Sequence, residues 1–121
     1  MTVSTKCFST PESFVYLTAW PGLGIVKFGF TGHLRTRTAR YTSKRGGVVL
    51  WSREFPTVDD GFRAEDLART ALRRKWPRAF TERGAAADLL GGRGSGWTEC
   101  LSVPDHRYQD AVDTIEEALN G

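Results

Sequence analysis

The chain has 121 residues with 40% apolar side chains, two cysteines, two histidines and a formal net charge of +3. That length suits one domain that buries about two-thirds of its unfolded surface. No stretch reaches the ~20 apolar residues of a membrane span, and Cys7 and Cys100 belong to no metal-ligand cluster. The composition thus excludes a membrane-spanning protein and a structural zinc protein. A disulfide is possible but not required, and a reduced cytoplasmic chain without a secretion signal is expected.

The first recognisable element is a predicted β-hairpin. Residues 14–20 and 25–31 are largely apolar runs, separated by a four-residue turn of Pro and Gly type, a common hairpin length. Pairing Trp20 with Ile25 across this turn makes one face of the hairpin wholly apolar. That face is therefore predicted to lie on the core.

The second face of the hairpin is polar. The same register places Tyr16 opposite Gly29 and puts Lys27 on the same side, which leaves an empty place between a phenol and an ammonium. A strand packed on a core does not need this pattern, so we expect a site here. The ammonium should also lower the pKa of the Tyr16 phenol below its free value near 10.

A short basic helix is predicted directly after the hairpin, over residues 34–41, with Thr31 or Gly32 at its cap. The free N–H groups at its start would form an anion site. Arg37 and Tyr41 are four residues apart and share one helix face. By itself Arg37 would be read as a solvated helix arginine, but the neighbouring hairpin favours a role in the site. Further cations, Arg35, Arg40 and Lys44, are expected to contact nucleic acid.

A third strand and a long helix come next. Residues 48–51 together with 54–55 predict a strand closed by proline, and residues 62–76 predict a helix capped by Asp59-Asp60-Gly61. Glu65 falls inside the apolar stripe of this helix, where a carboxylate needs an arginine or a metal ion as partner. The rest of the helix is basic, and its expected nucleic-acid contacts are Arg69, Arg73 and Arg74.

The last part of the chain is more mixed. Residues 85–90 allow one or two helical turns, residues 91–96 predict a mobile glycine-rich loop without P-loop spacing, and residues 97–103 suggest a short strand. An amphipathic helix is predicted at 106–119. The predicted fold class is α/β in the α+β sense, with a small three-stranded mixed or antiparallel sheet flanked by helices. It forms one domain over residues 14–121 after a polar lead-in at 1–13.

Charge is unevenly distributed along the chain. Residues 27–83 hold 14 Lys or Arg against 6 Asp or Glu, a balance of +8, whereas residues 84–121 hold 2 against 7, a balance of −5. This asymmetry predicts a basic working surface and an acidic flank. An ordinary solvated surface is the alternative.

The order of these residues resembles the GIY-YIG nuclease superfamily, most closely its compact bacterial and phage branch. The resemblance covers roughly residues 14–101 and departs at two positions, where the first glycine is Phe14 and the second tyrosine is Lys27. The matching elements are Phe14-Val15-Tyr16, Lys27-Phe28-Gly29, Arg37, Tyr41, Glu65 and, more faintly, Gly96-Trp97-Thr98-Glu99.

The resemblance implies a metal-dependent endonuclease that hydrolyses phosphodiester bonds, with DNA as the expected substrate. Tyr16 would be the base, although Lys27 leaves that assignment open. Arg37 would hold the phosphate, and Tyr41 would hydrogen-bond a phosphate or orient the water. Glu65 would bind one Mg²⁺ or Mn²⁺ ion. Two alternatives stay open: a catalytically inactive module that binds nucleic acid or protein, and an enzyme for a small substrate. The small size of the chain favours low sequence specificity, or sequence specificity supplied by a protein partner.

Overall fold

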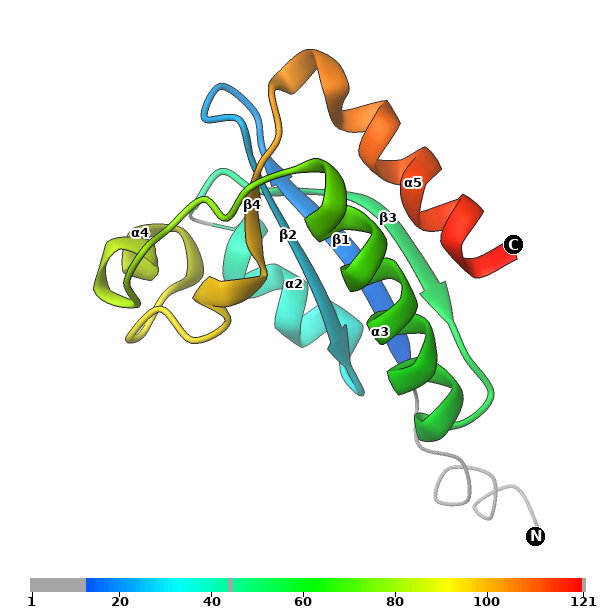
Figure 1. The fold of residues 1–121 in the computed structure, drawn as a ribbon. Coiled ribbons are helices and arrows are strands. Elements are labelled where there is room, and N and C mark those ends of the chain that lie inside the picture. Colours follow the sequence, from blue (N-terminus) through cyan, green and yellow to red (C-terminus); the bar gives the residue numbers. More distant parts are fainter. Residues whose placement is uncertain (1–12, 44, 121) are drawn as a thin grey trace, which may run out of the picture.

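A four-stranded antiparallel sheet with helices on both faces forms the centre of the protein (Figure 1). This computed structural model describes residues 13–43 and 45–120. The strands lie in the order β3-β1-β2-β4, and each neighbouring pair is antiparallel. Their bounds are β1 (Phe14–Trp20), β2 (Ile25–Thr31), β3 (Val48–Glu54) and β4 (Cys100–Ser102).

The predicted α+β class is therefore confirmed, but the predicted count of three strands is wrong. The fourth strand is β4, which pairs with the free edge of β2. It is only three residues long, too short for an alternating pattern to indicate where it belongs in the sheet. The expected lead-in at residues 1–13 lies outside the described residues except for Ser13, which is buried.

The predicted hairpin register is confirmed pair by pair. Trp20 is opposite Ile25, and Tyr16 is opposite Gly29. The apolar face of the hairpin packs against α3 (Val58–Lys75) and α5 (Tyr108–Asn120) and forms the main core. Alternation along the two strands is thus sufficient to place this face correctly.

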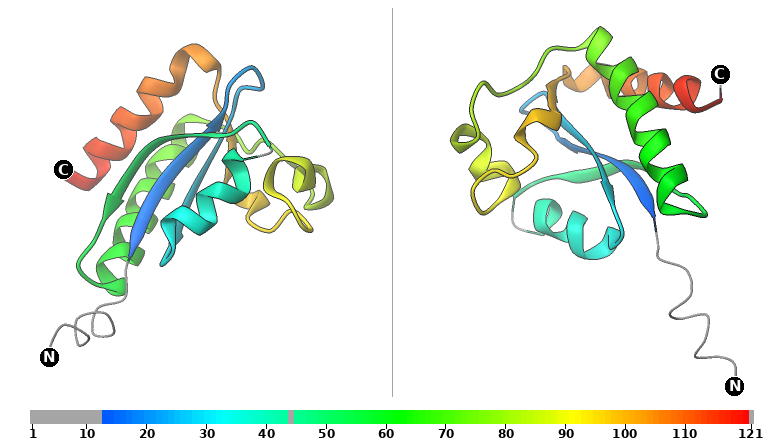
Figure 2. Two further views of the ribbon diagram at one scale, coloured as in Figure 1. Left: turned by 180° about the vertical axis from the view of Figure 1, so that it is seen from behind. Right: turned by 60° about the horizontal axis from the view of Figure 1, so that its bottom comes forward.

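The opposite face of the sheet is covered too. It packs against α2 (Leu34–Thr42) and against a segment that contains η1 (Gly84–Ala86), α4 (Ala87–Leu90) and η2 (Trp97–Glu99). Figure 2 shows α2 on one side of the sheet and α3 on the other. A second core of buried side chains fills this side: Tyr16, Trp20, Tyr41, Ala86, Leu90 and Cys100. The polar face of the hairpin is consequently not an open surface.

Helix α3 begins four residues earlier than predicted. Its N-cap is Thr57, whose side chain accepts a hydrogen bond from the backbone N–H of Asp60 at 3.0 Å. Asp59 and Asp60 lie in the first turn instead of capping it, where their charges suit the helix dipole. The predicted cap of α2 is also wrong: His33 is its N-cap, and Thr31 accepts a hydrogen bond from the His33 N–H at 3.0 Å.

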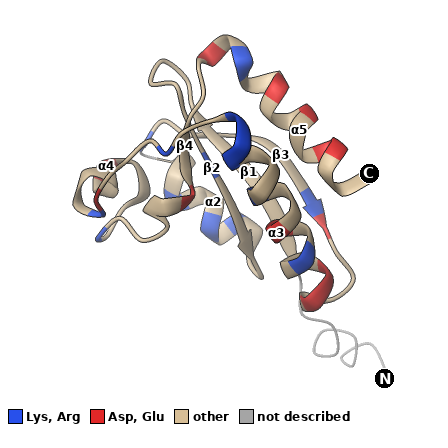
Figure 3. Ribbon diagram, viewed as in Figure 1, with Lys and Arg blue, Asp and Glu red and all other residues tan. Residues whose placement is uncertain are grey.

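Charge is distributed unevenly over the helices, as Figure 3 shows: basic residues lie on α2 and α3, and acidic residues dominate α5. Helix α2 contains three arginines and no acidic residue, whereas α5 contains four acidic residues and no lysine or arginine. The 3-10 turn η3 (Asp105–Arg107) leads into α5. Among the described residues, no helix combines the length and the apolar character needed to cross a membrane.

Candidate active site

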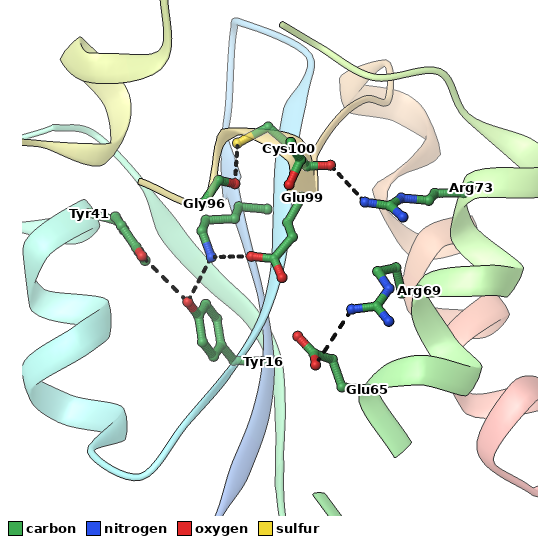
Figure 4. Close-up of polar contacts among 10 residues, drawn as sticks. Tyr16, Tyr41, Glu65, Arg69, Arg73, Gly96, Glu99 and Cys100 are labelled. Carbon is green, nitrogen blue, oxygen red and sulfur yellow. Dashed lines mark hydrogen bonds and ion pairs between the residues drawn. The ribbon is translucent and has the colours of Figure 1, made fainter. Parts of the chain in front are cut away.

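The side chain of Lys27 lies at the centre of a buried polar cluster. Its Nζ atom donates a hydrogen bond to the Tyr16 hydroxyl at 3.0 Å and forms an ion pair with Glu99 Oε1 at 3.4 Å. The hydroxyls of Tyr16 and Tyr41 are 3.4 Å apart. Figure 4 shows Tyr16, Tyr41 and Glu99 pointing toward one another from β1, α2 and the turn before β4. Lys27 is 2% exposed and Tyr16 is fully buried.

Two glycines give this cluster its space. A methyl group at Gly29 would lie 2.6 Å from the Tyr16 hydroxyl and 2.9 Å from Lys27 Nζ. Gly96 has a φ angle of +91°, and a methyl group there would lie 2.8 Å from Lys27 Cε. A larger residue at Gly29 would therefore displace the Tyr16 hydroxyl and the Lys27 ammonium, and one at Gly96 would add backbone strain. The empty place predicted opposite Tyr16 is occupied by the tyrosine ring and the lysine ammonium.

Burial dominates the protonation state of Tyr16. Desolvation raises the pKa of Tyr16 to about 12, and Tyr41 adds to this rise, although the Lys27 ammonium acts in the opposite direction. The prediction that Lys27 brings this pKa below 10 is therefore wrong, because α2 and the residue 79–99 segment exclude water from the phenol. At neutral pH in the free protein, Tyr16 is a phenol.

Lys27 remains an ammonium in spite of its burial. Burial by itself disfavours its charge, but the neighbouring acidic groups outweigh that effect and raise the pKa of Lys27 above its ordinary value: Tyr16 and Tyr41 when ionised, and Glu99. A buried cation of this kind needs a nearby acid, and Glu99 supplies one. The cluster thus holds a buried ammonium that is ion-paired with a carboxylate.

Glu65 lies on α3, across from the lysine cluster. Its side chain is 12% exposed, and Arg69 Nη1 lies 3.6 Å from Glu65 Oε1. Burial and then repulsion from Glu99 raise the pKa of Glu65, while Arg69 opposes that rise. Figure 4 shows the carboxylates of Glu65 and Glu99 turned toward each other. The expectation that Glu65 needs a cationic partner is met by Arg69.

A carboxylate pair of this kind fits a hard divalent cation. Mg²⁺ and Mn²⁺ prefer oxygen ligands, and Mg²⁺ commonly takes one or two carboxylates and keeps several waters. The repulsion that raises the pKa of Glu65 is the kind that such an ion relieves. The donor set therefore fits one Mg²⁺ or Mn²⁺ ion, with Glu65 as the residue that would hold it.

Arg37 lies at the edge of the cluster on α2. Burial lowers the pKa of Arg37, but the nearby hydroxyls of Tyr16 and Tyr41 outweigh burial and raise it above its ordinary value. Arg37 as a whole residue is half-buried. A planar cation in this position suits a phosphate better than a lysine would.

The structure brings the five predicted catalytic residues, Tyr16, Lys27, Arg37, Tyr41 and Glu65, near one another. The residue that sequence reasoning missed is Glu99. It is 72 positions from Lys27 in the chain, and its one signal was the faint similarity of Gly96-Trp97-Thr98-Glu99 to a family element. The catalytic roles themselves remain predictions.

The predicted nucleic-acid contacts are spread over several surfaces. Arg35 and Arg40 are exposed on α2, and Arg69 and Arg73 lie beside Glu65 and Glu99. Arg73 donates a hydrogen bond to the Thr98 carbonyl at 3.0 Å. Arg74 instead lines a hollow between α3 and α5, and Lys44 lies outside the described residues.

Comparison with known proteins adds no relative. A scan against protein-family models, a search of curated proteins and a search of solved structures each found no match to this chain. The GIY-YIG resemblance accordingly depends on the ordered residues of the sequence. Any function assigned to the protein depends on the geometry of the site.

Proposed function

We propose that the protein is a metal-dependent endonuclease of the GIY-YIG type that hydrolyses phosphodiester bonds in DNA. The observation that supports this best is the contact of Lys27 with Tyr16 beside a second tyrosine, an arginine and a pair of carboxylates. These groups come from different strands and helices, and all but Glu99 were predicted from the sequence as one set. A chance gathering of solvated surface residues would not bury a lysine and two tyrosines together.

Three further groups of the site would act on the phosphate or support the base. Arg37 would bind two oxygens of the scissile phosphate through its guanidinium fork. Glu65 would hold one Mg²⁺ or Mn²⁺ ion, which when bound supplies positive charge near the leaving oxygen. Tyr41, in hydrogen-bond range of Tyr16, keeps that hydroxyl oriented.

The proton acceptor in this proposal is the Tyr16 phenolate, beside the Lys27 ammonium. Because the pKa of Tyr16 is about 12 in the free protein, only a small fraction is phenolate at neutral pH. That fraction rises about tenfold per pH unit. Activity should therefore increase well into the alkaline range.

The proposal has two further parts. A partner protein would supply sequence specificity, and the protein would act in the cytoplasm.

A second candidate is a binding module with the same basic face and no catalysis. The burial of Tyr16 and the pairing of Lys27 with Glu99 favour it, because both groups are satisfied without a substrate. Such a module would bind nucleic acid, or a protein, mainly through the exposed arginines of α2.

One assay separates these candidates. The purified protein is incubated with supercoiled DNA, branched DNA and RNA, each with and without Mn²⁺, at pH 7 and pH 9. The endonuclease proposal expects cutting of DNA that needs Mn²⁺ and is faster at pH 9. Binding of any of these substrates without cutting would support the second candidate instead.

A further inference from the structure

Glu99 is the acid partner of the buried ammonium of Lys27. The two groups form a 3.4 Å ion pair, in which Lys27 is almost fully buried and the Glu99 side chain is 24% exposed. Within the described part of the chain, this is the one salt bridge that Lys27 makes. A charged lysine in such a place is costly unless it is paired and hydrogen-bonded. The geometry of Lys27 therefore depends on where Glu99 is held.

The turn that carries Glu99 is fixed from two directions. The backbone N–H of Glu99 donates a hydrogen bond to the Gly96 carbonyl at 3.0 Å, and this bond closes the 3-10 turn η2. Arg73 on α3 donates to the carbonyl of Thr98, the residue directly before Glu99. Residue 100 then enters β4 and pairs with Lys27 in the sheet. The backbone on each side of Glu99 is thus anchored to the elements that frame the site.

We propose that Glu99 is a positioning residue that holds the ammonium of Lys27 against the hydroxyl of Tyr16, and that Arg73 fixes the turn from which Glu99 acts. The catalytic consequence rests on the proposed function, whereas the positioning of Lys27 does not. Arg73, expected from the sequence to contact nucleic acid, has this second role because its guanidinium already contacts the Thr98 carbonyl.

The positioning role is tested in the free protein by NMR. The chain has four lysines and three tyrosines, so labelled lysine Nζ and tyrosine Cζ resonances can be assigned by substituting Lys27 and Tyr16 in turn. Glu99→Gln keeps the shape of the side chain and removes its charge. It should shift the resonances of both Lys27 and Tyr16, whereas Glu82→Gln, at an exposed position, should shift neither. Unchanged Lys27 and Tyr16 resonances in Glu99→Gln would overturn the proposal.

Arg73→Gln is the second variant, which guards against a folding failure of the first. Arg73 is exposed, so the fold should tolerate the change, and the Lys27 resonance should move in the same direction by a smaller amount. Arg74→Gln is the matched control, because the neighbouring Arg74 faces the hollow beside α5. Equal shifts from Arg73→Gln and Arg74→Gln would show that Arg73 has no specific role in holding the turn.

The catalytic consequence has its own readout. Glu99→Gln should lower kcat about tenfold or more with KM changed less than about twofold, because Lys27 acts on the chemical step through Tyr16. Glu99→Asp should recover part of kcat. If Glu99→Gln shifts the resonances but the wild type cuts no substrate, the positioning role is supported and the endonuclease is refuted. If the wild type cuts but Glu99→Gln shifts no resonance, the endonuclease is supported and the positioning role is refuted.

Discussion

The ammonium of Lys27 and the hydroxyl of Tyr16 are 3.0 Å apart although the two residues are not cross-strand partners. Tyr16 is paired with Gly29, and Lys27 is paired with Thr18. The contact is diagonal across the hairpin. It is possible because Gly29 has no side chain to fill the space between the two groups.

Gly29→Ala should therefore lower the free energy of unfolding by about 1–3 kcal/mol, the usual cost of forcing an extra carbon into a packed site. Its methyl group would lie within 3 Å of both Tyr16 and Lys27. Urea denaturation at neutral pH measures the change. The matched control is Gly84→Ala, where the nearest atom lies at an ordinary 3.5 Å. Equal stability of the two variants would mean that the hairpin face has more room than the structure shows.

The pH dependence of cleavage tests the role of Tyr16. Because burial raises its pKa to about 12, the phenolate fraction should grow with pH, and log kcat should rise with a slope near one from pH 7 to beyond pH 9. Tyr16→Phe should remove that rise and lower kcat by roughly 10²-fold, with affinity little changed. The measurement is single-turnover cleavage at saturating protein.

Lys27→Met should move the rising limb of the same profile to higher pH, since the lysine charge favours the phenolate. Methionine keeps most of the length of the side chain and removes the ammonium. A Lys27→Met protein that is inactive at every pH, beside an active Tyr16→Phe protein, would reverse the two roles and make the lysine the activating group.

Glu65→Gln should leave the fold at least as stable as the wild type at pH 7. Burial and the Glu99 charge raise the pKa of Glu65, so the folded state binds this proton more tightly than the unfolded state does. The stability that the proton contributes is present at low pH and is lost as pH rises through the folded pKa. Replacing Glu65 by glutamine removes this dependence of stability on pH. It also removes the 3.6 Å ion pair with Arg69, a type of pair worth about 0–1 kcal/mol.

Urea denaturation at pH 4 and pH 7 measures this effect, and the advantage of Glu65→Gln over the wild type should be larger at pH 7. A variant that is clearly less stable than the wild type at pH 7 would show that the ion pair with Arg69 outweighs the burial of the charge.

Salt dependence of DNA binding locates the binding surface. Replacing Arg35 and Arg40 by alanine should reduce the slope of log affinity against log salt by up to ~0.9 for each phosphate that the variant no longer neutralises. Both residues are exposed on α2, the helix that carries Arg37. The control pair is Arg74 and Lys75, because both line the hollow beside α5 and Lys75 donates to Thr114 at 3.0 Å. A larger reduction of the slope in the control pair would place the DNA on the α3–α5 side.

The hairpin was predictable in detail because alternation along the two strands determines which side chains share a face. Gly29, opposite Tyr16, leaves the space on that face. What was not predictable is how deeply that face is buried. The cover comes from α2 and from residues 79–99, which reach the hairpin only through long-range packing. The same packing explains the two errors at the site, the pKa of Tyr16 and the omission of Glu99. Neither depends on any pattern within a single element.

Metal-dependent cleavage by the wild type and by Glu65→Gln tests the central claim most directly. Both proteins are incubated with supercoiled plasmid and Mn²⁺ at pH 9, and nicked and linear products are measured over time. The endonuclease proposal predicts products from the wild type only, and none from either protein when the metal is chelated. Equal cleavage by Glu65→Gln would remove Glu65 from the metal site, and no cleavage by a folded wild-type protein would contradict the proposed activity itself.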